Sequence, residues 1–246
     1  MNKVYLTGDK HGRFDDLAAN IEMFGIDKDD YVVIMGDSGL NYFSGKRANA
    51  YKKKLNDIGP KFLIVRGNHE ARPNGVEEFY GDDVISGCFM RDRNEHGDIM
   101  FENIFYMLDG GVYTIAGKSV LVIGGAYSVD KFYRLVRTEE GLDGYYWFPD
   151  EQLDDNELSE IMETAKELKQ VDYIFTHTCP LSYEPTDLFL PGIDQSTVDQ
   201  TTEEFLEDIH NVLTYDKWYC GHWHTDRIVD DIRFLYHNII KLGEMY

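Results

Sequence analysis

The sequence predicts a single α/β domain, and three observations support this. The chain has 246 residues, of which 43% are hydrophobic, enough to build one large domain around a continuous core. Short apolar, β-branched runs alternate with segments of helical periodicity. The first three apolar runs each end in a polar, glycine-containing turn, as is typical of the carboxyl ends of strands in open α/β sheets. The expected organisation is therefore one domain over residues 1–246.

The first part of the chain predicts a βαβαβ unit. Strands are expected at residues 4–7, 31–35 and 61–65, with helices at residues 15–24 and 46–58 between them. The turns after these strands contain the pairs Gly8-Asp9, Gly36-Asp37 and Gly67-Asn68. Ligands bind beyond the carboxyl ends of strands in such sheets, so these turns form a candidate site.

The rest of the chain predicts further strands and two helices. A hairpin is expected at residues 112–116 and 119–124, with later strands at 173–176, 217–220 and 233–236. Helices are expected at residues 155–170 and 198–213. Residues 71–110 and 127–154 have weaker periodicity, and we expect them to be insertions beside the sheet.

The charge balance argues against long nucleic acids as partners. The chain has 24 Lys and Arg against 45 Asp and Glu, which gives a formal net charge of −21. A field of this sign repels polyanions unless a local basic patch opposes it. Alternatively, most of these carboxylates only coat a solvated surface.

The cysteine content favours a reducing compartment. Cys88, Cys179 and Cys220 are far apart and form no Cys-x-x-Cys pair. The first residues lack a long apolar region, and no stretch approaches the roughly 20 apolar residues that a membrane span needs. We therefore expect a cytoplasmic protein with no membrane partner.

A set of metal-ligating residue types follows the predicted strands. Asp9 and His11 are two residues apart, as are His222 and His224, and in extended backbone such pairs project to the same side. Seven side chains are expected to converge on one rim of the sheet: Asp9, His11, Asp37, Asn68, His177, His222 and His224. Oxygen and imidazole ligands together suit manganese, iron, zinc, cobalt or nickel better than an ion that prefers oxygen alone.

The order of these motifs resembles that of the calcineurin-like metallophosphoesterases. The motifs are Gly8-Asp9-x-His11-Gly12, Gly36-Asp37, Gly67-Asn68-His69-Glu70, His177 and Gly221-His222-x-His224. The resemblance implies a two-sheet β-sandwich flanked by helices, in αββα layers. It also implies hydrolysis of a small or medium phosphomonoester or phosphodiester by a water or hydroxide that two metal ions activate.

The resemblance further implies a role for each site residue. Asp9, His11 and His224 would hold one divalent ion, Asn68, His177 and His222 the second, and Asp37 would bridge them, with manganese the first expectation. His69 would protonate the leaving group as general acid, although a structural hydrogen bond is the alternative.

The sequence departs from one branch of this family. Protein serine/threonine phosphatases place Asp-Arg two residues after the Gly-Asp pair, whereas this chain has Leu40-Asn41. That activity is therefore in doubt, and the phosphate grip must come from elsewhere. Arg66, or Lys131 and Arg134, are the candidates, with a surface salt bridge as the alternative for the latter two.

Two other functions remain open. A nuclease would share the dimetal chemistry but is opposed by the acidic charge. A noncatalytic protein-binding scaffold occurs among relatives that have lost metal ligands, whereas here all seven ligand positions are filled. The oligomeric state is not indicated by the sequence.

Overall fold

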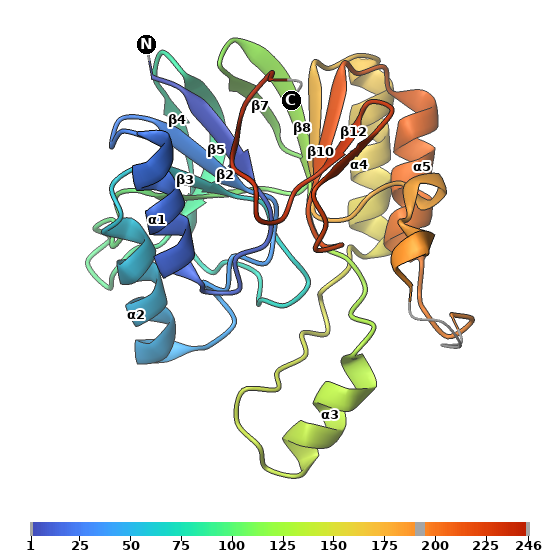
Figure 1. Cartoon of the computed structure of the whole chain (residues 1–246), viewed down its shortest axis with the longest axis horizontal. Helices are drawn as coiled ribbons and strands as arrows, with labels where there is room; N and C mark the ends of the chain where they lie inside the picture. Colours follow the sequence, from blue (N-terminus) through green and yellow to red (C-terminus); the bar gives the residue numbers. More distant parts are fainter. Residues whose placement is uncertain (1, 190–194, 245–246) are drawn as a thin grey trace.

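A computed structural model of the chain describes residues 2–189 and 195–244, and its strands form one curled, mixed sheet (Figure 1). The strands are β1 (Val4–Thr7), β2 (Tyr31–Ile34), β3 (Lys61–Ile64), β4 (Val76–Gly81), β5 (Ile85–Arg91), β6 (Ile104–Met107), β7 (Val112–Ile115), β8 (Lys118–Ile123), β9 (Tyr173–Thr176), β10 (Lys217–Cys220), β11 (Arg227–Val229), β12 (Ile232–Phe234) and β13 (Ile240–Lys241). The helices are α1 (Phe14–Phe24), α2 (Gly45–Asn56), α3 (Lys131–Glu139), α4 (Asp155–Leu168) and α5 (Thr201–Val212), with short 3₁₀ turns at Leu181–Tyr183 and Thr186–Leu188.

Two parallel groups of strands direct their carboxyl ends to the same region. In one group β1 pairs with β2 and β2 with β3, and in the other β8 pairs with β9 and β9 with β10, all in parallel. The strand order is β11-β12-β10-β9-β8-β7-β5-β6-β3-β2-β1-β13, with β4 on β5. The predicted βαβαβ unit is confirmed, with each strand boundary within one residue of the expectation.

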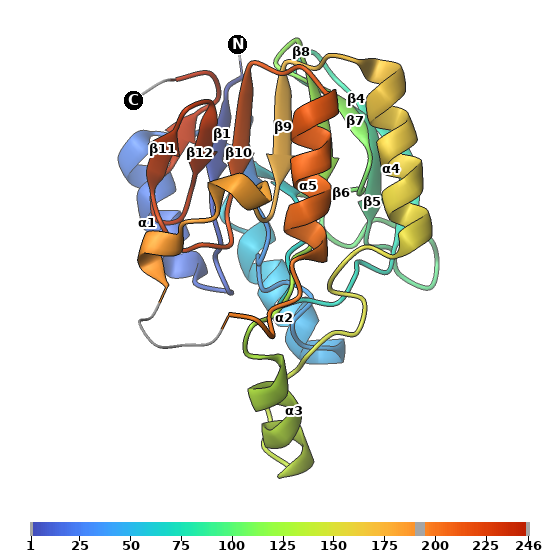
Figure 2. The same ribbon diagram turned by 90° about the vertical axis from the view of Figure 1, so that its right-hand side faces the viewer.

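Three apolar clusters define the layers. The first lies inside the curl of the sheet and includes Leu6, Val33 and Phe175. The second packs α4 and α5 against β8, β9 and β10 (Figure 2). The third packs α1 and α2 against β1, β2 and β3 (Figure 1). Helices therefore cover both outer faces, as expected, but hydrogen bonding joins the strands into one continuous sheet and not the two separate sheets that the resemblance implied.

The two segments of weak periodicity differ from each other. Residues 71–110 were expected beside the sheet, but they contribute β4, β5 and β6 to it. Residues 127–154 instead carry α3, which extends away from the body of the molecule (Figures 1 and 2) and has no buried residue. The longest helix, α4, has 14 residues, and within the described ranges no helix has the length and apolarity to cross a membrane.

Candidate metal centre

The seven predicted ligands lie directly beyond the carboxyl ends of β1, β2, β3, β9 and β10, at the rim that the parallel pairing creates. Two groups of possible ligand atoms form there, each with all its atoms within 4.8 Å of one another. The first contains Asp9, His11 and His224, and the second contains Asp9, Asp37 and His177.

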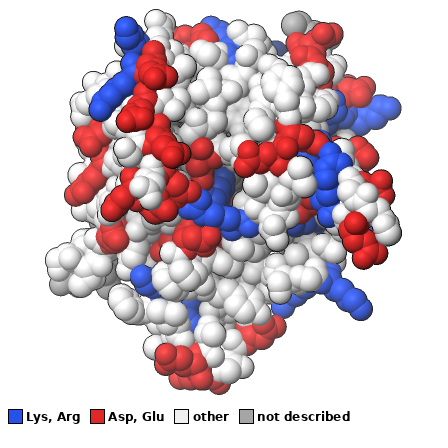
Figure 3. Space-filling view, turned by 180° about the vertical axis from the view of Figure 1, so that it is seen from behind, with Lys and Arg blue, Asp and Glu red and all other residues white. Residues whose placement is uncertain are grey.

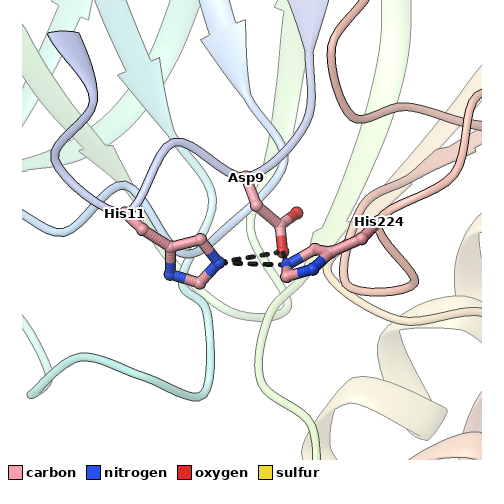
Figure 4. A group of neighbouring side chains, drawn as sticks. All are labelled: Asp9, His11 and His224. Carbon is pink, nitrogen blue, oxygen red and sulfur yellow. Dashed lines mark hydrogen bonds and ion pairs between the residues drawn. The ribbon is translucent and has the colours of Figure 1, made fainter.

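The first group joins the two ends of the chain (Figure 4). The Nε2 atoms of His11 and His224 are 3.1 Å apart. The Oδ2 atom of Asp9 lies 3.2 Å from His224 Nε2 and 3.8 Å from His11 Nε2. The ligand atoms of Asp9 and His11 thus meet that of His224, which lies 213 positions after His11 in the chain.

The second group is buried deeper. His177 is fully buried, and its Nδ1 lies 2.8 Å from the carbonyl oxygen of Met35, to which it donates. Its Nε2 then presents a lone pair, and this atom faces Asn68 Oδ1 at 2.8 Å and Asp37 Oδ2 at 3.7 Å. The amide nitrogen of Asn68 donates to Ser128 Oγ at 2.8 Å, which keeps the amide oxygen directed at His177. A cation between these three electron-rich atoms would stabilise their close approach.

His222 is placed beside this group but not within it. Its backbone N–H donates to Asp9 Oδ1 at 2.8 Å. Its ring centroid lies 4.9 Å from that of His177, and it lines a cavity together with Asp37 and Asn68.

The electrostatics of the site fit a pair of cations. The Oδ2 atoms of Asp9 and Asp37 are buried and lack any hydrogen-bond donor among the described residues. Burial, and then the nearby carboxylates of Asp9 and Glu70, raise the pKa of Asp37 well above its ordinary value. Burial also lowers the pKa of His11 to about 4 and that of His222 to about 3, so both imidazoles are neutral at pH 7. The contact with Asp9 instead raises the pKa of His224. Neutral imidazoles such as those of His11 and His222, and carboxylates, are the ligand forms that a divalent ion takes up.

The backbone of the site is strained in a way that suits ligand positioning. Four predicted ligands adopt positive φ angles, which non-glycine residues rarely do: His11 (45°), Asp37 (44°), His222 (63°) and His224 (47°). Such strain concentrates at active sites and ligand clamps. Glycines beside the ligands allow close approach, because a Cβ atom on Gly36 would lie 2.0 Å from His177 Nδ1 and one on Gly67 2.0 Å from Asp37 Oδ1.

Comparison with known proteins identifies the family. The sequence model of one protein family, described as calcineurin-like phosphoesterase, matches residues 2–226. The chain belongs to this family. Membership of this family indicates metal-dependent hydrolysis of phosphoesters, a chemistry that the ligand geometry fits.

Comparison with solved structures gives one alignment that supports the fold, and the fold alone. One solved structure aligns with a TM-score of 0.51 and 12% identity, covering 95% of this chain and 89% of that chain. The crystal structure of TT1561 from Thermus thermophilus aligns with a TM-score of 0.47 and 12% identity, covering 96% of this chain and 88% of that chain. No curated protein matches the chain.

In this calcineurin-like phosphoesterase, His69 lies between two cavities. Its backbone N–H donates to Asp37 Oδ1 at 2.8 Å, and its ring centroid is 5.9 Å from that of His11. One cavity of about 220 Å³ also contains His11 and Arg134. The other, of about 360 Å³, also contains Asp37, Asn68 and His222. Burial, followed by the charge of Arg134, lowers the pKa of His69 to about 3.

The three candidate phosphate grips have different surroundings. Arg66 is buried. Its guanidinium donates hydrogen bonds to Asp109 Oδ2 at 2.7 Å and to backbone carbonyls, including that of Glu151 at 2.8 Å. These hydrogen-bond donors of Arg66 are therefore engaged by the protein itself. The Nζ atom of Lys131 lies 4.2 Å above the ring of Trp147, whereas Arg134 lines the cavity beside His69.

The structure gives a role to three other positions around the site, of which only Ser128 was not indicated by the sequence motifs. Leu40, which stands where related protein phosphatases carry Asp, is fully buried in the cluster beneath α1 and α2. Glu70 accepts hydrogen bonds from the Ser38 hydroxyl at 2.8 Å and backbone at 3.3 Å, and so supports the turn after Asp37. Ser128, the partner of Asn68, has no recognisable motif, because only the fold brings it within reach.

Proposed function

We propose that the chain hydrolyses a small or medium phosphomonoester or phosphodiester with two divalent cations bound at this rim. Asp9, His11 and His224 hold one cation, and Asn68, His177 and His222 hold the second. Asp37 bridges them. This role rests on the family resemblance, because Asp9, and not Asp37, is the residue that belongs to both groups of close ligand atoms. Manganese is the first ion to test, and the donor set also suits iron, zinc, cobalt and nickel.

One observation carries the proposal. Two buried carboxylate oxygens, on Asp9 and Asp37, have no hydrogen-bond donor among the described residues and are surrounded by imidazole nitrogens. Burying such charges costs several kcal/mol unless a positive charge compensates for them. Divalent cations provide this charge, and they also lower the pKa of water and neutralise phosphoryl oxygens.

The residues around the ligands have separate tasks. His69 faces both cavities and donates a proton to the leaving oxygen, for which its ring must first gain a proton. An anionic phosphoryl group nearby raises the pKa of the imidazole and so favours this form. Arg134 is the basic side chain that shares a cavity with His11 and His69, and we assign it to the phosphoryl oxygens.

The acidic charge supports small substrates over long nucleic acids. Acidic side chains are spread over the face in Figure 3, with basic side chains scattered among them. The formal charge of −21 opposes a polyanion. The missing Asp-Arg pair argues against protein serine/threonine phosphatase activity, and the filled ligand set argues against a purely noncatalytic scaffold.

The test compares three substrates on manganese-loaded protein: bis-p-nitrophenyl phosphate, p-nitrophenyl phosphate and single-stranded DNA. Turnover of either nitrophenyl ester should exceed that of DNA and should be lost in His222→Ala. His96→Ala is the matched control, since His96 is 75% exposed and lies outside the site. DNA as the best substrate would favour the nuclease, and full activity in His222→Ala would contradict the ligand assignment.

A further inference from the structure

The smaller cavity beside the proposed metal centre is walled by aromatic rings. Its volume is about 220 Å³, and Tyr42, Phe43 and Tyr51 line it together with His11 and His69. The imidazoles of His69 and of the proposed ligand His11 form the side of the cavity that faces the metal centre. A substrate whose phosphoryl group lies at the metal centre would therefore direct a substituent between these rings.

The rings are held in place before any substrate arrives. Tyr42 and Phe43 have centroids 4.9 Å apart in an edge arrangement, and Phe43 and Tyr51 have centroids 5.6 Å apart. The Tyr42 hydroxyl donates to the Gly144 carbonyl at 2.6 Å. The guanidinium carbon of Arg47 lies 3.3 Å from the Phe43 ring centroid and covers one ring face. Fixed rings lose little conformational entropy when a flat group binds beside them.

The charge of the wall is balanced. Arg134 is the cationic side chain in the lining, and its Nε lies 2.8 Å from both carboxylate oxygens of Asp130. Its Nη1 donates to the Tyr42 hydroxyl at 2.9 Å. Away from the phosphoryl position, the cavity therefore suits an uncharged substituent better than a second anion.

The size of the cavity limits the occupant further. Pockets that enclose drug-sized ligands measure about 300–1,000 Å³, so a cavity of about 220 Å³ holds one ring system. We infer that this cavity binds the planar aromatic group of an aryl or nucleoside phosphoester. The inference rests on the proposed function, because it places the phosphoryl group of that ester at the metal centre.

Binding of nonhydrolysable phosphonates tests the inference without requiring turnover. Calorimetry on manganese-loaded protein would compare phenylphosphonate with cyclohexylphosphonate, which has a similar volume but no aromatic ring. Contacts between aromatic rings predict that the phenyl compound binds about fivefold more tightly. The ratio of the two dissociation constants should fall to about 1 in Phe43→Leu and in Tyr51→Leu. It should be retained in Tyr51→Phe, which keeps the ring.

A second pair of compounds distinguishes an aryl ester from a nucleoside ester as the occupant of the cavity. The nonhydrolysable methylenephosphonate analogue of AMP is compared with that of ribose 5-phosphate, so that only the nucleobase differs. A preference for the AMP analogue that disappears in Phe43→Leu identifies a nucleobase, whereas a preference confined to phenylphosphonate identifies an aryl ester.

Phe79→Leu is the control variant, since Phe79 is an exposed ring on β4, outside the cavity. Equal affinities within both ligand pairs, or a ring preference that survives in Phe43→Leu and Tyr51→Leu, would overturn the inference. A ring preference in protein that turns over no phosphoester would contradict the proposed function but support the inference.

Discussion

Replacing Asp37 with asparagine should change stability in opposite directions without and with metal. In the metal-free protein this carboxylate is buried, and one of its oxygens lacks a donor among the described residues. An asparagine there keeps the acceptor for the His69 N–H. It also places an amide near the ring nitrogens of His177 and His11, which lie 3.7 Å and 3.9 Å from Asp37 Oδ2. Asp37→Asn should therefore stabilise the metal-free chain.

The size of this effect follows from the distance between two carboxylates. Ligand oxygens of Asp9 and Asp37 lie within 4.8 Å of each other, and two full charges at that distance repel by about 3.5 kcal/mol at an effective dielectric constant of about 20. The raised pKa of Asp37 shows that protonation relieves part of this repulsion. We expect a net gain of about 1–2 kcal/mol, or about 2–8 °C in Tm.

Manganese should reverse the order of the two proteins. At a free concentration about 100 times Kd, a ligand that binds only the folded state adds about 2.7 kcal/mol, or about 5–10 °C here. The wild type should gain this increment, and Asp37→Asn should lose most of it.

Scanning calorimetry in chelator and in manganese measures both effects. Asp109→Asn is the matched control. It breaks the buried contact with Arg66 and should destabilise the protein equally in both conditions. The reasoning is refuted if Asp37→Asn destabilises the metal-free protein, or if it keeps the full manganese increment.

Three further predictions concern single side chains. His69→Ala should retain metal and should reduce kcat by about 10²–10⁴, most strongly for substrates with poor leaving groups. Steady-state assays with nitrophenyl and alkyl esters measure this effect. Loss of metal with unchanged turnover per bound metal would contradict the prediction. Arg66→Ala should lower the free energy of unfolding, measured in urea titrations, by about 3–5 kcal/mol. A raised KM at unchanged stability would instead indicate that Arg66 binds the substrate. Burial raises the pKa of Glu203 to about 7, so its contribution to stability is greatest below about pH 4.5 and is lost as pH rises through about 7. Glu203→Gln should therefore stabilise the protein by about 2 kcal/mol more at pH 8 than at pH 5, and a pH-independent effect would refute the assignment.

The part of the fold that positions the site was predictable from local patterns. β1, β2 and β3 are continuous apolar runs, because both faces of these strands are covered. The periodicity of α1 and α2 between them is equally clear. Since parallel strands end at one rim, the turns after them were expected to meet there, and the structure brings Asp9, His11 and His224 together.

The hairpin of β4 and β5 was missed for a physical reason. β4 has no fully buried residue, and its Glu77 and Glu78 carry charges on a strand that pairs only with β5 among the described strands. Edge strands of this kind carry a weak hydrophobic signal, so their sequence does not distinguish them from a loop. The case of α3 differs, because its apolar side chains recur at helical spacing although none of its residues is buried.

Long-range contacts explain why the role of Arg66 was not visible in the sequence. The residue stands next to the Gly67-Asn68 turn, and proximity alone suggested a phosphate ligand. Its partners Asp109, Asp150 and Glu151 lie 43 to 85 positions away. Only the folded chain shows that its donors are already used. In the same way, only the folded chain shows that Tyr51 lies close to the turn that carries His11. A Cβ atom added to Gly12, the next residue, would lie 2.4 Å from the Tyr51 ring.

The central claim is that Asp37 and its neighbours hold two catalytic cations. The most direct test is elemental analysis of the metal-stripped protein during manganese titration, with hydrolysis of bis-p-nitrophenyl phosphate and p-nitrophenyl phosphate followed on the same samples. We predict two manganese ions per chain and turnover that rises with metal content in the wild type but not in Asp37→Ala. Absence of bound metal, or turnover that persists in chelator, would contradict the account.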